Sequence, residues 1–155
     1  MFRIVAGLVA GSCMLTSSAF AQPPAPAQQA TAAPPARVFG SDTGLVLNFI
    51  KPDKTADFEA IVAKVKEALQ KSANPQRQKQ AASWRVFKSP DPAAGGAALY
   101  VFIVDPVVKG ADYTVSAILA EAFPDELTAL YKTYSEAYAS GQNFVNLSLV
   151  ADLGK

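Results

Sequence analysis

Residues 44–50 read GLVLNFI, and this stretch decides the fold. Every residue in it except Gly44 and Asn48 is apolar, which is typical of a β-strand. Residues 51–53 read KPD and are expected to end the strand. A helix with Thr55 as its N-cap is expected next, because apolar residues then recur at helical spacing: Phe58, Ile61, Val62, Val65 and Leu69.

The rest of the chain continues the alternation of strands and helices. A polar stretch at 76–80 is expected to form a loop, and further strands are predicted over 82–88, 97–104 and 144–150. Helices are predicted over 115–123 and from Pro124 to a closing Gly141. The order strand, helix, strand, strand, helix, strand predicts an α+β fold of the ferredoxin-like βαββαβ type. Such a fold has a four-stranded antiparallel sheet with helices on one face.

One face of the predicted sheet is wholly apolar, and we expect the helices to cover it: Leu45, Leu47, Phe49, Leu99, Val101, Ile103, Val145, Leu147 and Leu149. The opposite face is then open, yet it is also largely apolar. Leaving such side chains in water costs on the order of 1.5–3 kcal/mol each, and an exposed patch of this kind marks an interface or a ligand groove. The sequence therefore predicts a homodimer whose interface includes Val46, Ile50, Phe102, Val104 and Phe144.

Three polar residues are expected to meet on that open face. Asn48, Tyr100 and Asn146 lie on strands that are neighbours in a ferredoxin-like sheet. They could orient a small apolar ligand in a cavity between two sheets, or they could hydrogen-bond to one another or to the partner chain. Trp84 and Arg85 point to opposite sides of one strand, so one of them is expected to reach the open face and to contact a ligand or partner.

Composition excludes several kinds of chemistry. The chain has 155 residues, 14 Lys+Arg against 13 Asp+Glu, and no histidine. Without histidine there is no Ser-His or Cys-His nucleophile and no His-bound metal or haem. Balanced charge gives no attraction to nucleic acid or to a membrane surface. We expect neither a metal nor a cofactor, because no phosphate-binding loop, CxxC pair or nucleophile elbow is present.

Residues 1–21 predict a bacterial signal peptide. Arg3 precedes a short apolar run, and small residues lead to a cleavage site after Ala21, which would place the mature protein in the periplasm or outside the cell. Cys13 lies in a run, VAGSC, that loosely resembles a lipobox, so lipidation at Cys13 is the alternative. Residues 22–39 predict a Pro/Ala-rich disordered linker, and 40–155 predict one domain.

The stretch from Leu45 to Lys54, followed by the helix that carries Phe58, resembles the dimeric α+β barrel superfamily, which includes antibiotic-biosynthesis monooxygenase-like and stress-responsive barrel proteins. The resemblance covers residues 44–150 and includes the order of elements. It implies that two sheets pair face to face around a cavity. Some members are cofactor-free oxygenases and some bind haem through a histidine, which this chain lacks. Residues 83–88 and 105–112 are also similar to stretches of exported bacterial proteins.

Two functional classes follow from these observations. The first is a non-enzymatic exported homodimer that binds a small apolar ligand or serves in assembly. The second is a cofactor-independent enzyme, oxygenase-like or isomerase-like, with its site in the dimer cavity. In that case Asp, Glu or Tyr side chains would have to transfer protons.

Overall fold

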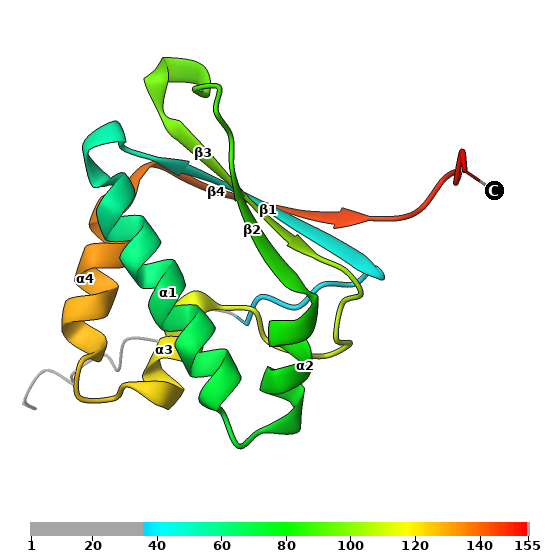
Figure 1. Ribbon diagram of the computed structural model, residues 1–155, viewed down its shortest axis with the longest axis horizontal. Helices are drawn as coiled ribbons and strands as arrows, with labels where there is room; N and C mark the ends of the chain where they lie inside the picture. The colour runs from blue at the N-terminus through cyan, green and yellow to red at the C-terminus, as the bar shows by residue number, and fades with distance from the viewer. Residues whose placement is uncertain (1–35, 155) are drawn as a thin grey trace, which may run out of the picture. The chain divides into compact units, whose positions relative to one another are not determined.

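A computed structural model describes residues 36–154 and shows an α+β fold built on one antiparallel sheet (Figure 1). The four strands, in the order β2-β3-β1-β4, are β1 (Thr43–Ile50), β2 (Trp84–Lys88), β3 (Ala98–Val104) and β4 (Tyr138–Leu147). Within the described range, four α-helices lie on one side of this sheet and no element covers the other: α1 (Thr55–Lys71), α2 (Pro75–Ser83), α3 (Val115–Ala122) and α4 (Leu127–Ala137). The α+β class and the four-stranded antiparallel sheet are confirmed.

The predicted signal peptide, Cys13 and most of the predicted linker lie outside the described residues. At its C-terminal end the linker prediction needs correction, because Phe39 is only 2% exposed and belongs to the core. Its ring stacks on Phe144 at 4.0 Å between centroids and meets Tyr113 edge-on. Gly44 makes room for this ring, since a Cβ at Gly44 would lie 2.3 Å from it.

Helix α1 packs as its spacing predicts. Phe58, Ile61, Val65 and Leu69 are all buried, and the helix contacts each of the other three helices. The apolar face of α1 therefore packs into the core, and Phe58 reaches the sheet at Tyr100 and Phe102.

Helix α2 occupies the stretch expected to be a loop. Pro75 sits in its first turn, and the Asn74 side chain accepts a hydrogen bond from the Gln76 amide at 2.9 Å, which caps the helix. The helix has no apolar stripe and is held instead by polar contacts. Buried Arg77 pairs with Glu121 and donates to the Gln80 side chain and to the Asp112 carbonyl.

Strand β4 begins at Tyr138, six residues before the predicted start. Gly141 does not close α4. It lies in the strand with φ +90° opposite Phe49, next to the point where the register between β1 and β4 shifts. A left-handed backbone at this irregularity favours glycine, so the residue that resembles a helix stop in the sequence belongs to a bulge.

The helix-covered face of the sheet is the reverse of the predicted one. Val46, Ile50, Phe102 and Val104 are buried in the core beneath the helices, and Phe144 is partly buried against it. These are the residues predicted to form the dimer interface, and that assignment is wrong. Both faces are apolar, so the sequence lacks the difference in polarity that usually distinguishes a covered face from a solvated one.

The Asp112 carboxylate fixes the loop before α3 through hydrogen bonds. It accepts hydrogen bonds from the Arg37 amide at 2.9 Å and from the Thr114 amide and hydroxyl at 2.8 and 2.6 Å. Burial acts to raise the pKa of Asp112, but these hydrogen bonds and nearby Arg77 outweigh it and hold the pKa below its usual value. A lowered pKa stabilises the fold above the unfolded-state pKa, and the contribution is lost as pH falls through the folded-state pKa.

We therefore expect Asp112→Asn to lower the free energy of unfolding by about 1–2 kcal/mol at pH 7, since hydrogen bonds to a charged group are lost. Urea unfolding of both proteins between pH 3 and pH 7 should show the difference shrinking toward the acid end. Asp91→Asn, at an exposed loop position, is the matched control. A difference that stays constant over this range would contradict the assigned role of the carboxylate.

Candidate functional site

The side of the sheet away from the helices carries apolar side chains on every strand. Residues paired across neighbouring strands share a face, and Leu47 pairs with Val101, which in turn pairs with Phe87. We call this surface the open face. It consists of Leu45, Leu47, Phe49, Phe87, Leu99, Val101, Ile103, Val145 and Leu147. Except for Phe87, these residues belong to the set predicted to lie under the helices, and that prediction is wrong.

The open face is uncovered by any described element. Phe87 is 50% exposed and Leu147 is 38% exposed, while the central residues are half-buried by their own neighbours. Strands spaced about 4.8 Å apart, with about 3.3 Å per residue, give a patch of roughly 400 Å² in plan. That is the size of the largest apolar patches on soluble monomers, which are often functional. Two charged residues lie at the margins of this face: Arg85, in register with Ile103 on edge strand β2, and Asp105 just after β3, whose carboxylate accepts a hydrogen bond from the Thr43 hydroxyl at 3.2 Å.

The predicted trio of Asn48, Tyr100 and Asn146 does not meet on the open face. Asn48 is opposite Tyr100 in the register, but both are buried on the helix-covered side. Gln142, and not Asn146, is opposite Asn48 on β4. Asn146 lies farther along β4, where its side-chain oxygen accepts a hydrogen bond from the Gly40 amide at 2.7 Å. These three residues therefore cannot line a space between two open faces.

Asn48 belongs to a polar cluster that we define as Asn48, Tyr134, Tyr138 and Gln142. The Asn48 side-chain oxygen accepts hydrogen bonds from the Tyr138 hydroxyl at 3.0 Å and from the Gln142 amide at 2.8 Å. Its amide donates to the backbone carbonyls of Val46 and Tyr100. Burial and the adjacent Tyr134 raise the pKa of Tyr138 far above its usual value. The cluster therefore stays protonated and hydrogen-bonded over the physiological pH range.

Tyr100 makes a second polar contact nearer the surface. Its hydroxyl donates to the Glu59 carboxylate, which also pairs with Lys88 at 2.9 Å. Hydrogen bonds from Tyr100 and Lys88 lower the pKa of Glu59, and burial raises the pKa of Tyr100. These contacts join α1 to strands β2 and β3 along one edge of the sheet.

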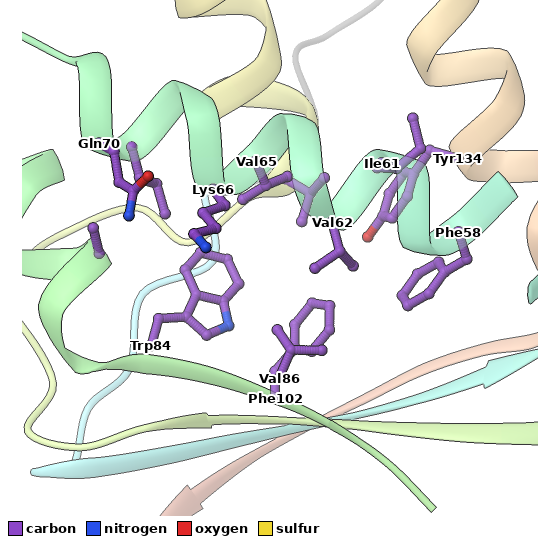
Figure 2. A pocket seen from close by; sticks show the side chains of 13 residues that line it. Phe58, Ile61, Val62, Val65, Lys66, Gln70, Trp84, Val86, Phe102 and Tyr134 are labelled. Atoms are coloured by element: carbon purple, nitrogen blue, oxygen red, sulfur yellow. The ribbon is translucent and has the colours of Figure 1, made fainter. Parts of the chain in front are cut away.

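Trp84 and Arg85 lie on opposite faces of β2, and Trp84 is on the covered side. Its indole packs edge-on against Phe102 and Tyr113, with centroids 5.6 and 5.4 Å away. Beside it, between α1 and β2, lies a cavity of about 220 Å³, which we call the α1–β2 cavity (Figure 2). Among the described residues, Trp84 Nε1 is the only buried side-chain nitrogen or oxygen that lacks a hydrogen-bond partner. Such an unsatisfied donor costs about 1–3 kcal/mol.

Within residues 36–154, no group of three or more Asp, Glu, Cys or His side chains is placed to hold a metal ion. No helix of that range combines the length and the hydropathy that crossing a bilayer requires. Comparisons of the chain with protein-family models, with curated proteins and with solved structures gave no match.

Proposed function

We propose that this protein is a non-enzymatic assembly domain that forms a homodimer through the open face. The observation that carries the proposal is an apolar patch spanning all four strands that no described element covers. Exposed apolar surface of this extent is stabilised when a partner removes it from water.

A second copy is the partner that fits this patch best. A partner of different chemistry would call for complementary charges or hydrogen-bonding groups. The open face has few of these: Arg85 and Asp105 lie at its margins, with Thr43 and Asn143 as polar neighbours. An apolar surface is self-complementary, which a two-fold dimer requires. The accessible area of each face exceeds its plan area because side chains project from the sheet. Two such faces therefore bury on the order of 1,000 Å² in total, which is in the lower range of specific interfaces.

We also propose the finer fold and the location that accompany this function. The strand order β2-β3-β1-β4 with antiparallel neighbours supports a ferredoxin-like sheet. Face-to-face pairing of such sheets is what the resemblance to dimeric α+β barrels implies. The sequence of residues 1–21 supports export, so the dimer would form in the periplasm or outside the cell.

Native mass spectrometry and light scattering of the mature protein test this proposal. We expect a dimer at micromolar concentration. Leu47→Lys, at the centre of the face, should raise the dissociation constant at least about 100-fold, because it buries an unpaired charge. Phe87→Lys should do the same at a site that is half-exposed in the monomer and therefore tolerates the change.

Thr128→Lys, on the exposed surface of α4, is the matched control and should leave the dimer intact. A wild-type protein that stays monomeric at 100 µM contradicts the proposal. So does a dimer that neither open-face variant weakens.

A further inference from the structure

We propose that the end of β4 pairs antiparallel with the same segment of a second copy, so that two sheets join along their rims. The segment consists of residues 144–150, and we call it the β4 edge. The contact runs along the rim of the sheet and not across the open face. The proposal therefore goes beyond the face-to-face dimer and does not depend on it.

The β4 edge has an outer side that no described strand occupies. In the order β2-β3-β1-β4, β4 is an edge strand, and its ladder with β1 ends where Leu147 meets Thr43. Past Leu147 the chain continues outward from the sheet, without a neighbouring strand among the described residues (Figure 1). There, Leu149 is 84% exposed and Val150 is 98% exposed. Backbone groups and apolar side chains are therefore both available for a second strand.

Edge strands usually carry features that prevent such pairing, such as short length, charged side chains, prolines or a bulge. The opposite edge strand, β2, has two of these features, because it is five residues long and carries Arg85 and Lys88. The β4 edge has none of them. Residues 138–151 contain no charged residue and no proline, and the bulge at Gly141 lies before the segment. Of the two rims of this sheet, β4 is therefore the one suited to pairing.

The sequence of the β4 edge has the symmetry that self-pairing requires. Residues 144–150 read FVNLSLV, and the order of apolar and polar positions is the same in both directions from Leu147. In a two-fold pair centred on Leu147, Asn146 lies opposite Ser148 of the other copy. Every apolar side chain then lies opposite an apolar one: Phe144 opposite Val150, Val145 opposite Leu149, and Leu147 opposite Leu147. A different partner would not require this symmetry, so a second copy is the partner that fits.

The area of the edge contact sets its strength. Seven residues at about 3.3 Å each, in a sheet about 10 Å thick, give roughly 500 Å² in total from the two copies. This is below the roughly 1,200 Å² of stable interfaces, so the edge contact alone is weak. The axis of the edge contact is normal to the sheet, and that of a face-to-face dimer is parallel to it. The two contacts can therefore coexist, and together they would close a tetramer at high protein concentration.

Disulfide trapping tests the pairing at single-residue resolution. Leu147→Cys places two thiols on opposed residues, whose Cα atoms lie about 4.5–5.5 Å apart in an antiparallel pair, within reach of a disulfide. Cys13→Ser removes the only cysteine of the chain, and Leu47→Lys weakens the face-to-face dimer, so that the edge contact is tested by itself. We expect a covalent dimer under mild oxidation. Ser148→Cys is the matched control and should crosslink at least about tenfold less, because it lies opposite Asn146 and not opposite itself.

Shortening the chain tests the role of the exposed apolar residues. A chain that ends at Ser148 lacks Leu149 and Val150 and should crosslink at position 147 at least about tenfold less, since two of the apolar pairs are lost on each side. A chain that lacks only Gly154 and Lys155 should crosslink as the full chain does. Circular dichroism confirms the fold of each variant.

Three results would overturn the edge contact. They are equal crosslinking at positions 147 and 148, crosslinking that shortening leaves unchanged, and an absence of crosslinking at position 147 whenever Leu47→Lys is present. The last result would mean that the thiols meet only through the open face. Native mass spectrometry of the protein without these cysteine variants measures the face-to-face dimer, so failure of the edge contact and failure of the proposed dimer are distinguishable.

Discussion

Phe58→Ala is expected to lower the free energy of unfolding by about 4 kcal/mol, within the range for deleting a buried aromatic ring. Phe58 is 0% exposed and joins α1 to the sheet and to α4. Its ring lies 4.8 Å from that of Tyr100, 5.8 Å from Tyr138 and 6.3 Å from Tyr134. The rings around it belong to three different elements, and these cannot all shift to fill the space of the deleted ring. The alanine variant therefore keeps a cavity.

Urea unfolding followed by circular dichroism measures this effect, at one protein concentration so that any dimer contributes equally. Tyr131→Ala on α4 is the control, because its ring is 51% exposed and should cost less than about 1 kcal/mol. Phe58→Leu should fall in between. A loss below about 1.5 kcal/mol for Phe58→Ala would show that the surrounding rings collapse into the space.

The parts of the fold that depend on apolar periodicity are predictable from the sequence. Helix α1 has its apolar residues at helical spacing, and α3 was bounded by the change from a Gly- and Asp-containing loop to an apolar run. Strands β1 and β3 agree with the predicted ranges to within one residue at each end. In each case burial of apolar surface fixes the element, and turn-forming residues next to it fix its limits.

Elements held by polar contacts are not predictable in this way. Helix α2 is anchored by Arg77 and Gln80, whose partners Asp112 and Glu121 are more than thirty residues away in the chain. The Asn74-Pro75 pair, which is read as a stop for α1, also caps α2. That capping pattern is the one local signal that could have revealed the helix.

The site prediction failed for a related reason. It assigned the wholly apolar face to the helices and left Asn48 exposed, but Asn48 is buried because the polar cluster satisfies its hydrogen bonds. Gln142 and Tyr134 complete the cluster only through the early start of β4 and the bulge at Gly141. The prediction that one apolar face of the sheet lacks helices still holds after this correction, because both faces are apolar and the helices cover only one of them. Only the residues assigned to that face change.

Asn48→Leu is expected to cost about 3 kcal/mol, because leucine keeps the branched shape of the side chain but can neither donate nor accept the hydrogen bonds that the partners of Asn48 need. The Val46 and Tyr100 carbonyls lose a donor, and the Tyr138 hydroxyl and the Gln142 amide lose an acceptor. Each buried group left unsatisfied costs about 1–3 kcal/mol, and neighbours recover part of it. The raised pKa of Tyr138 means that the cost should be the same from pH 6 to pH 9.

A double-mutant cycle shows whether the cluster acts as a unit. Tyr138→Phe alone removes one hydroxyl and should cost about 1 kcal/mol, since Gln142 can still donate to both Asn48 and Tyr134. In the Asn48→Leu background the same change should cost less, because the acceptor that the hydroxyl needs is already gone, and a coupling of about 1 kcal/mol is expected. Additive losses would mean that Asn48 is buried for its packing and that the hydrogen bonds contribute independently. Coupled losses would show that the hydrogen bonds of the cluster stabilise Asn48 in its buried position on the helix-covered face, although the opposite face is the more apolar one.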